Sequence, residues 1–190
     1  MKKSIILFAS VLVFFSFASC TESASKVEDT KKVAEEHNEA KFSTKKESDA
    51  QFLVNTAEMN LEQIKLGELA QTNSTTPDVK KMGLMMKIDH AQGLKDLTRL
   101  AGAKQVTLPT SITDAGQAAY NKLMVKRGKA FDKEYCDMMV KGHKDAVDKF
   151  DKAPTTIADA DVKVWAAMLL PALRTHLDAS ITCQKKCEKM

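Results

Sequence analysis

Apolar residues recur at every third or fourth position along most of this chain, which is the spacing of helices that bury one face. Four long segments share this pattern. The first is expected to open at the S-x-x-Q capping box of Ser48, and the second at Thr76-Pro77, where threonine suits the N-cap and proline the first helical position. Their apolar positions are Ala50, Leu53, Val54, Ala57, Leu61 and Ile64, then Val79, Met82, Met86, Leu94, Leu97 and Leu100.

The third and fourth segments follow the same spacing. The third is expected to begin after Gly128 and to close at "DKAPTT", and the fourth to run from about Asp159. A longer link, residues 103–128, separates the second segment from the third and holds a short helix. Together these features predict an all-α fold, a ferritin-like four-helix bundle over residues 48–188, in which a long crossover lets the second and third helices run parallel.

The N-terminus has the features of an export signal over residues 1–19. Lys2-Lys3 precede the apolar run "SIILFASVLVFFSF", which is shorter than the ~20 residues that a membrane-spanning helix needs. Ala18-Ser19 followed by Cys20 resembles the lipobox of bacterial lipoproteins. That resemblance implies lipidation of Cys20 and anchoring in the outer membrane of a two-membrane bacterium; the alternative is simple secretion, with Cys20 unmodified or removed.

Residues 20–47 contain few large apolar side chains, so this segment is predicted to be a flexible tether between the lipidated cysteine and the bundle. The formal net charge is +4, and acidic and basic residues are interspersed without a basic stripe or an aromatic platform. We therefore expect no nucleic-acid partner. No G-x-S-x-G, H-E-x-x-H or phosphate-loop motif occurs, which argues against an enzyme and against an organic cofactor.

Several sequence blocks resemble a bacterial family of ferritin-like domains of unknown function, whose members are often labelled putative outer-membrane proteins. The blocks are "DAQFLVNTAEMNLEQIKLGELA", "DVKKMGLMMKIDHAQGLKDLTRLA", "LP", "FDKEYCDMMVKGHKDAVDKF" and "LLPALRTHLDAS", in this order between Asp49 and about Cys183. The resemblance implies the fold and an envelope setting. It implies no activity, because the role of the family is itself unassigned.

Histidines on three different predicted helices lie on or beside the apolar seams. His90 and His143 are expected at one height in the bundle, with His176 lower. The candidate ligands of a transition metal in that layer are Glu58, Glu62, Met86, His90, Met139 and His143. Imidazole and thioether groups suit copper. The alternatives are histidines with a purely structural role and histidines that sense pH.

Ferritin-like di-iron sites require Glu-x-x-His on two helices. Here Lys87, Val140 and Leu173 stand three residues before the three histidines, so di-iron chemistry is not expected. Cys183 and Cys187 are one helical turn apart and could form a two-thiol metal clip or part of a frayed tail. The sequence thus leaves two hypotheses: a non-enzymatic envelope lipoprotein that binds a protein partner or maintains the envelope, and a copper-like metal-binding or metal-buffering protein.

Overall fold

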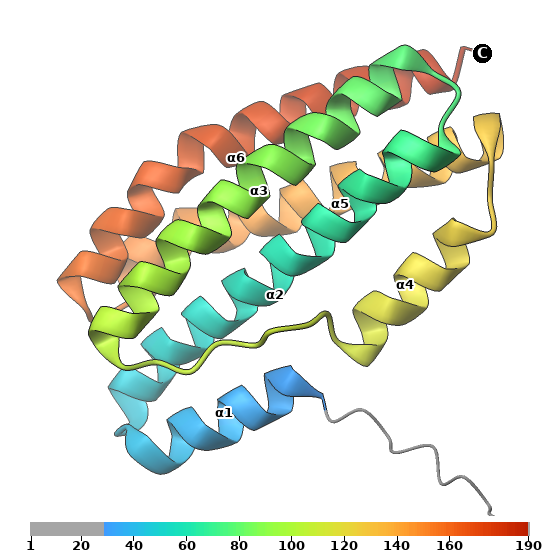
Figure 1. The fold of residues 1–190 in the computed structure, drawn as a ribbon. Coiled ribbons are helices and arrows are strands. Elements are labelled where there is room, and N and C mark those ends of the chain that lie inside the picture. The colour runs from blue at the N-terminus through green and yellow to red at the C-terminus, as the bar shows by residue number, and fades with distance from the viewer. Residues whose placement is uncertain (1–28, 190) are drawn as a thin grey trace, which may run out of the picture.

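The structure, a computed structural model, describes residues 29–189 and is an all-α helical bundle, as the sequence predicts. No strand occurs among these residues. Within residues 29–189 six helices follow one another, four of them long and two short (Figure 1). They are α1 (Thr30–Lys41), α2 (Thr44–Asn73), α3 (Pro77–Lys104), α4 (Asp114–Met124), α5 (Gly128–Thr156) and α6 (Ala160–Cys187).

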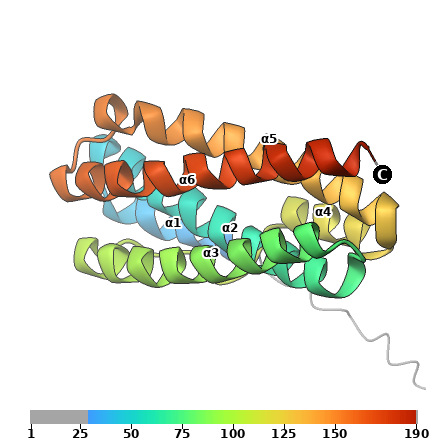
Figure 2. The same ribbon diagram turned by 90° about the horizontal axis from the view of Figure 1, so that it is seen from above.

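The four long helices form two antiparallel hairpins, α2 with α3 and α5 with α6, which pack side by side (Figures 1 and 2). At one end of the bundle, the Asp49 carboxylate near the start of α2 accepts the backbone N–H groups of Ala158 and Asp159, which join α5 to α6. At the other end, Asn73 of α2 donates to the carbonyl of Lys126, just before α5. These contacts show that α2 runs antiparallel to α5.

The crossover between the hairpins, residues 105–127, runs the length of the bundle and contains α4 (Figure 1). It begins at Gln105, whose φ of 60° ends α3 in the left-handed conformation. Lys104 at the end of α3 contacts Asp159 at the start of α6, with 2.7 Å between Nζ and Oδ2. Because α3 therefore runs antiparallel to α6, and α6 antiparallel to α5, the crossover leaves α3 and α5 parallel.

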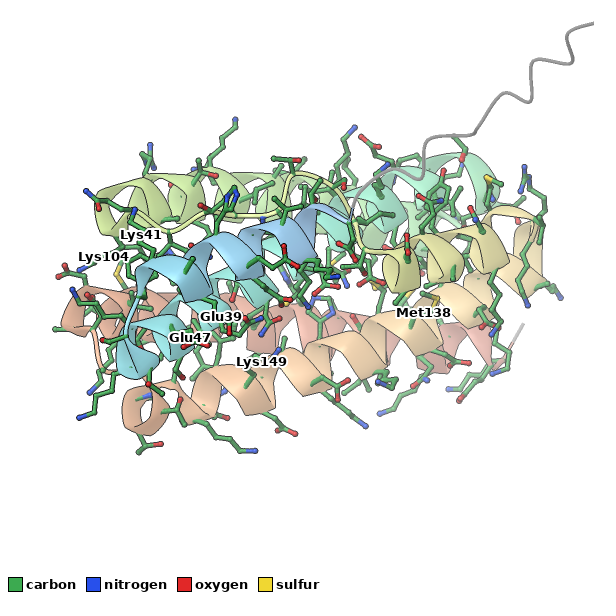
Figure 3. All side chains as sticks on the ribbon, turned by 90° about the horizontal axis from the view of Figure 1, so that it is seen from below. Glu39, Lys41, Glu47, Lys104, Met138 and Lys149 are labelled. Carbon is green, nitrogen blue, oxygen red and sulfur yellow. The ribbon has the colours of Figure 1, made fainter. Side chains whose placement is uncertain are left out.

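Most of the segment expected to be a tether is instead helical. Helix α1 occupies residues 30–41, and α2 begins at Thr44 rather than at Ser48. Asn38 fixes α1 to the crossover through both groups of its amide: Nδ2 donates to the Thr107 carbonyl at 2.9 Å and Oδ1 accepts the Thr107 N–H at 2.8 Å. Hydrogen bonds to the backbone of the crossover therefore hold α1 against the bundle, although α1 has few apolar residues to bury. Figure 3 views the bundle from the side on which α1 and α4 lie.

The core consists of two apolar clusters, one toward each end of the bundle. The first contains Leu66, Met82, Met86, Phe131, Tyr135, Cys136, Met139 and Cys183 among others, and the second contains Leu53, Leu97, Phe150, Val162 and Leu173 among others. Between the two clusters each long helix buries one or two polar residues: Asn60 and Gln63 on α2, His90 on α3, His143 on α5, and His176 and Ser180 on α6. The polar layer therefore crosses the middle of the bundle. No helix among residues 29–189 is long and apolar enough to span a bilayer.

Candidate metal centre

The three helical histidines of the polar layer come together at the centre of the bundle. His90 of α3, His143 of α5 and His176 of α6 are 3%, 1% and 4% exposed. One ring nitrogen of each histidine lies within 4.8 Å of the corresponding nitrogens of the other two. The ring centroids are 5.2 to 5.6 Å apart. Three imidazoles that share so small a buried volume are the ligand type that zinc and copper prefer.

Each of the three rings has one nitrogen engaged by a neighbour outside the triad. His90 Nδ1 lies 2.8 Å from Asn60 Oδ1, and His143 Nδ1 lies 2.8 Å from the carbonyl oxygen of Met139, one turn earlier on α5. His176 Nε2 lies 3.0 Å from Asp89 Oδ2. All three neighbours present oxygen acceptors, so each ring donates an N–H outward. Metal-bound histidines are held in the same way, by an acceptor on the nitrogen that does not bind the metal.

The outward hydrogen bonds determine which nitrogens carry lone pairs. A neutral imidazole has one N–H and one lone pair, so His90 and His143 keep their lone pairs on Nε2 and His176 keeps its lone pair on Nδ1. His176 Nδ1 is buried and has no hydrogen-bond partner among the described residues. His90 Nε2 and His143 Nε2 face each other at 3.4 Å. Two lone pairs at this distance repel unless a proton or a metal ion lies between them.

The distance between the facing nitrogens matches a shared metal ion. For zinc–nitrogen bonds of about 2.0–2.1 Å in tetrahedral geometry, two ligating nitrogens lie about 3.3–3.4 Å apart. The observed separation of His90 Nε2 and His143 Nε2 is 3.4 Å, which is long for a hydrogen bond between them. His90 and His143 are therefore already spaced as ligands of one metal ion, and His176 lies within 4.8 Å of both.

Burial keeps the facing rings neutral. The pKa of His90 is lowered well below its ordinary value, first by burial and then by the neighbouring His143 and His176. The pKa of His143 is lowered to about 4, again mainly by burial. At neutral pH a bridging proton between these rings is therefore disfavoured, and both lone pairs are free to bind a metal ion.

Comparison with known proteins places the chain in a family. A family model described as "Domain of unknown function (DUF4142)" matches residues 32–181. The chain belongs to this family. No curated protein and no solved structure matches the chain. The part of the chain matched to DUF4142 begins within α1, ends within α6 and includes all three histidines.

The structure of this DUF4142 domain brings together a different set of residues from the one expected. His90 and His143 meet, as predicted, but His176 lies with them rather than lower in the bundle. Glu58 lies apart from the triad and contacts Lys31 and Thr113 instead. Glu62 lines a surface groove with Glu58, and its pKa is raised by burial and then by Glu58. Neither glutamate is placed to be a ligand of the histidine site.

The two predicted thioether ligands belong to the apolar core. Met86 and Met139 are fully buried in the cluster that contains Leu66 and Tyr135. Met139 contributes to the site through its backbone carbonyl, not through its sulfur. Cys20 and the lipobox lie outside the described residues.

Sequence reasoning missed two residues that orient the rings, Asn60 and Asp89. The sequence contained one feature that could have pointed to each of them. Asn60 is the residue of α2 opposite His90 when the hairpin turns at residue 75, and it is a polar residue on a buried face. Asp89 directly precedes His90, and its side chain reaches His176 on a neighbouring helix.

Proposed function

We propose that this DUF4142 protein is a metal-binding lipoprotein of the cell envelope that holds one transition-metal ion on His90, His143 and His176. The observation that carries the proposal is the arrangement of the triad: each ring is oriented by an outward acceptor, and the remaining lone pairs converge in a buried space. This arrangement combines a ligand set with the surrounding hydrogen bonds that a metal site needs.

The donor set favours zinc or copper. Three neutral imidazoles suit both ions, and no carboxylate of the described residues joins the group of ring nitrogens. The burial of all three rings argues for holding or buffering the ion rather than for catalysis on a substrate, because a catalytic ion needs a coordination position that the substrate can reach.

The arrangement of the long helices supports the finer description of the fold, a ferritin-like four-helix bundle. Two antiparallel hairpins joined by a long crossover, with α3 and α5 parallel, are the topology of that class. Helices α1 and α4 are additions outside the four. In this proposal the bundle keeps the central position of a ferritin-like metal site but replaces its carboxylates with imidazoles.

The envelope setting rests on the leader and on Cys20. A short apolar export signal followed by a lipobox-like Ala18-Ser19-Cys20 would place the domain at a membrane surface, held by several acyl chains. Cys20→Ser should release the protein from the outer-membrane fraction. Unchanged fractionation of that variant would contradict the anchor.

Equilibrium titration with Zn²⁺ and Cu²⁺ tests the metal site. The titrated protein is a variant in which all four cysteines are replaced by serine, so that thiols cannot bind the metal. Circular dichroism verifies that this variant is folded. We expect one ion per chain, and loss of binding in His143→Gln. The matched control is His37→Gln, because His37 is exposed on α1 and outside the triad. Absence of stoichiometric binding, or equal binding in the two variants, would contradict the proposal.

A further inference from the structure

A second group of metal-binding side chains lies toward the end of the bundle where α6 ends. Cys136 of α5 meets Cys183 and Cys187 of α6, and the three sulfur atoms lie within 4.8 Å of one another. Cys136 and Cys183 are buried, and Cys187 is half-buried. Cys183 and Cys187 are one helical turn apart and therefore share the face of α6 that packs on Cys136.

We propose that Cys136, Cys183 and Cys187 form a binding site for one Cu(I) ion, separate from the histidine site. Each thiol that binds the ion releases its proton to solvent, and no electron is transferred, because the copper arrives as Cu(I). The site goes beyond the proposed function: it uses different residues and a different donor atom, and it lies toward one end of the core rather than at its middle.

The spacing of the sulfur atoms fits a three-coordinate ion. Three sulfurs bonded to one ion at about 2.3 Å in a trigonal arrangement lie about 4 Å from one another. Cys136 Sγ and Cys187 Sγ are 3.6 Å apart, well beyond the about 2.05 Å of a disulfide bond. The third sulfur, on Cys183, lies within 4.8 Å of both. Small movements of the three side chains would place all of them around one ion.

One buried donor close to the thiols lacks a partner, and a copper-bound thiolate would give it one. The hydroxyl of Tyr135, the residue before Cys136 on α5, is buried and has no hydrogen-bond partner in the described part of the chain. A thiolate bound to Cu(I) carries negative charge and would accept a hydrogen bond from this hydroxyl, which offsets the cost of burying it.

The sulfur-only set and its surroundings favour Cu(I). Thiolate and thioether ligands select soft ions, whereas structural zinc sites almost always have four ligands. A groove of about 410 Å³ between α3 and α6 is lined by Met82, Met85 and Cys183 among others. Through this groove a soft ion would reach Cys183 from the surface past two methionines.

The test uses the full chain with Cys20→Ser, which leaves three of its four cysteines. The chain is purified in mild detergent with a non-thiol reductant and titrated anaerobically with Cu(I) against a chromogenic Cu(I) chelator. The chain also carries His143→Gln, which removes one ligand of the histidine site so that imidazoles do not compete for the ion. In this background we expect one tightly bound Cu(I) per chain, with sulfur ligands in X-ray absorption spectra. Adding Cys187→Ser, chosen because Cys187 is half-buried, should weaken binding at least tenfold.

Three outcomes would overturn the thiol site. The first is the absence of stoichiometric Cu(I) binding in the His143→Gln background with all three thiols present, and the second is nitrogen rather than sulfur ligation of the bound Cu(I) in that background. The third is a disulfide between Cys136 and Cys187 in protein isolated from the envelope. Because the X-ray absorption measurement needs no variant at the thiols, a folding defect in Cys187→Ser would not hide the answer.

Discussion

Asn60 Oδ1 lies 2.8 Å from His90 Nδ1, and this contact fixes which nitrogen of His90 faces the other two imidazoles. An acceptor on Nδ1 holds the proton there and leaves the lone pair on Nε2, directed at His143. A side chain of α2 thus orients a ring of α3, although α2 contributes no histidine to the triad. All four long helices therefore take part in the candidate metal centre.

Asp89 should strengthen metal binding without touching the ion. Its carboxylate accepts from His176 Nε2, which makes the imidazole a better ligand through Nδ1. We expect Asp89→Ala to weaken Zn²⁺ binding about 10- to 100-fold, measured by titration calorimetry. Asp96→Ala is the matched control on α3, because Asp96 contacts Gln92 and Arg99 at the surface instead. Equal losses in the two variants would contradict the role of Asp89.

Replacing two glycines of α3 by alanine should change the free energy of unfolding in opposite directions. A Cβ at Gly83 would lie 2.5 Å from the Cβ of Ala70, whereas a Cβ at Gly102 would meet nothing within 4 Å. We expect Gly83→Ala to force α2 and α3 apart and to lower the free energy of unfolding by about 1–3 kcal/mol. Gly102→Ala should raise it by about 0.5–1 kcal/mol. Urea denaturation measures both, and similar values for the two variants would show that the helices are not so closely packed.

Asn38 should be necessary for docking of α1. Asn38→Ala leaves the N–H and carbonyl of Thr107 without their partner, at a cost of about 1–3 kcal/mol. Hydrogen exchange should then increase over residues 30–41 and 105–111, while the long helices keep their protection. Glu39→Ala is the control, because Glu39 is exposed on the same helix. Unchanged protection of α1 in Asn38→Ala would show that other contacts hold it.

The long helices could be predicted because each has an apolar seam with helical spacing and clear end signals, such as Thr76-Pro77 before α3. Helix α1 could not be predicted in the same way. Only Ala34 among its apolar residues is buried, and its attachment depends on Asn38 and Thr30, which bond to the crossover. A polar side chain that pairs with the backbone of a distant loop leaves no periodic signal in the sequence.

Only part of the site could be predicted, because its geometry depends on where each hairpin turns. The segment "DKAPTT" is expected to close the third long helix, and α5 ends at its last residue, Thr156, after passing through Pro154. Because α5 and α6 therefore turn at 157–159, His143 lies across from the turn of α6 that contains His176. The prediction that Glu58 and Glu62 are metal ligands was wrong for a simpler reason. Each is two residues from Asn60, and two residues turn a helix by about 200°.

The buried histidines should make the metal-free protein less stable in acid. The pKa of His143 is about 4 in the folded chain, against 6.5 for an exposed histidine, and the pKa of His90 is also lowered. Below pH 6.5 the unfolded chain binds more protons, so stability falls as the pH drops from about 6.5 to about 4, by about 3 kcal/mol for His143 alone. Above pH 6.5 these rings do not change the free energy of unfolding with pH, because they are neutral in both the folded and the unfolded chain. Denaturation of wild type and His143→Gln across this range checks the prediction, and parallel curves would contradict it.

The protonation states of the three rings decide whether their lone pairs converge on one metal ion. Long-range proton–nitrogen NMR spectra of the ¹⁵N-histidine-labelled chain, recorded at neutral pH with and without Zn²⁺, identify the nitrogen that carries the proton in each ring. We predict Nδ1–H for His90 and His143 and Nε2–H for His176, with Zn²⁺ shifting only the other nitrogen of each ring. A proton on His90 Nε2, donated to His143, would contradict the account, because the triad would then be a hydrogen-bonded core and not a set of converging lone pairs.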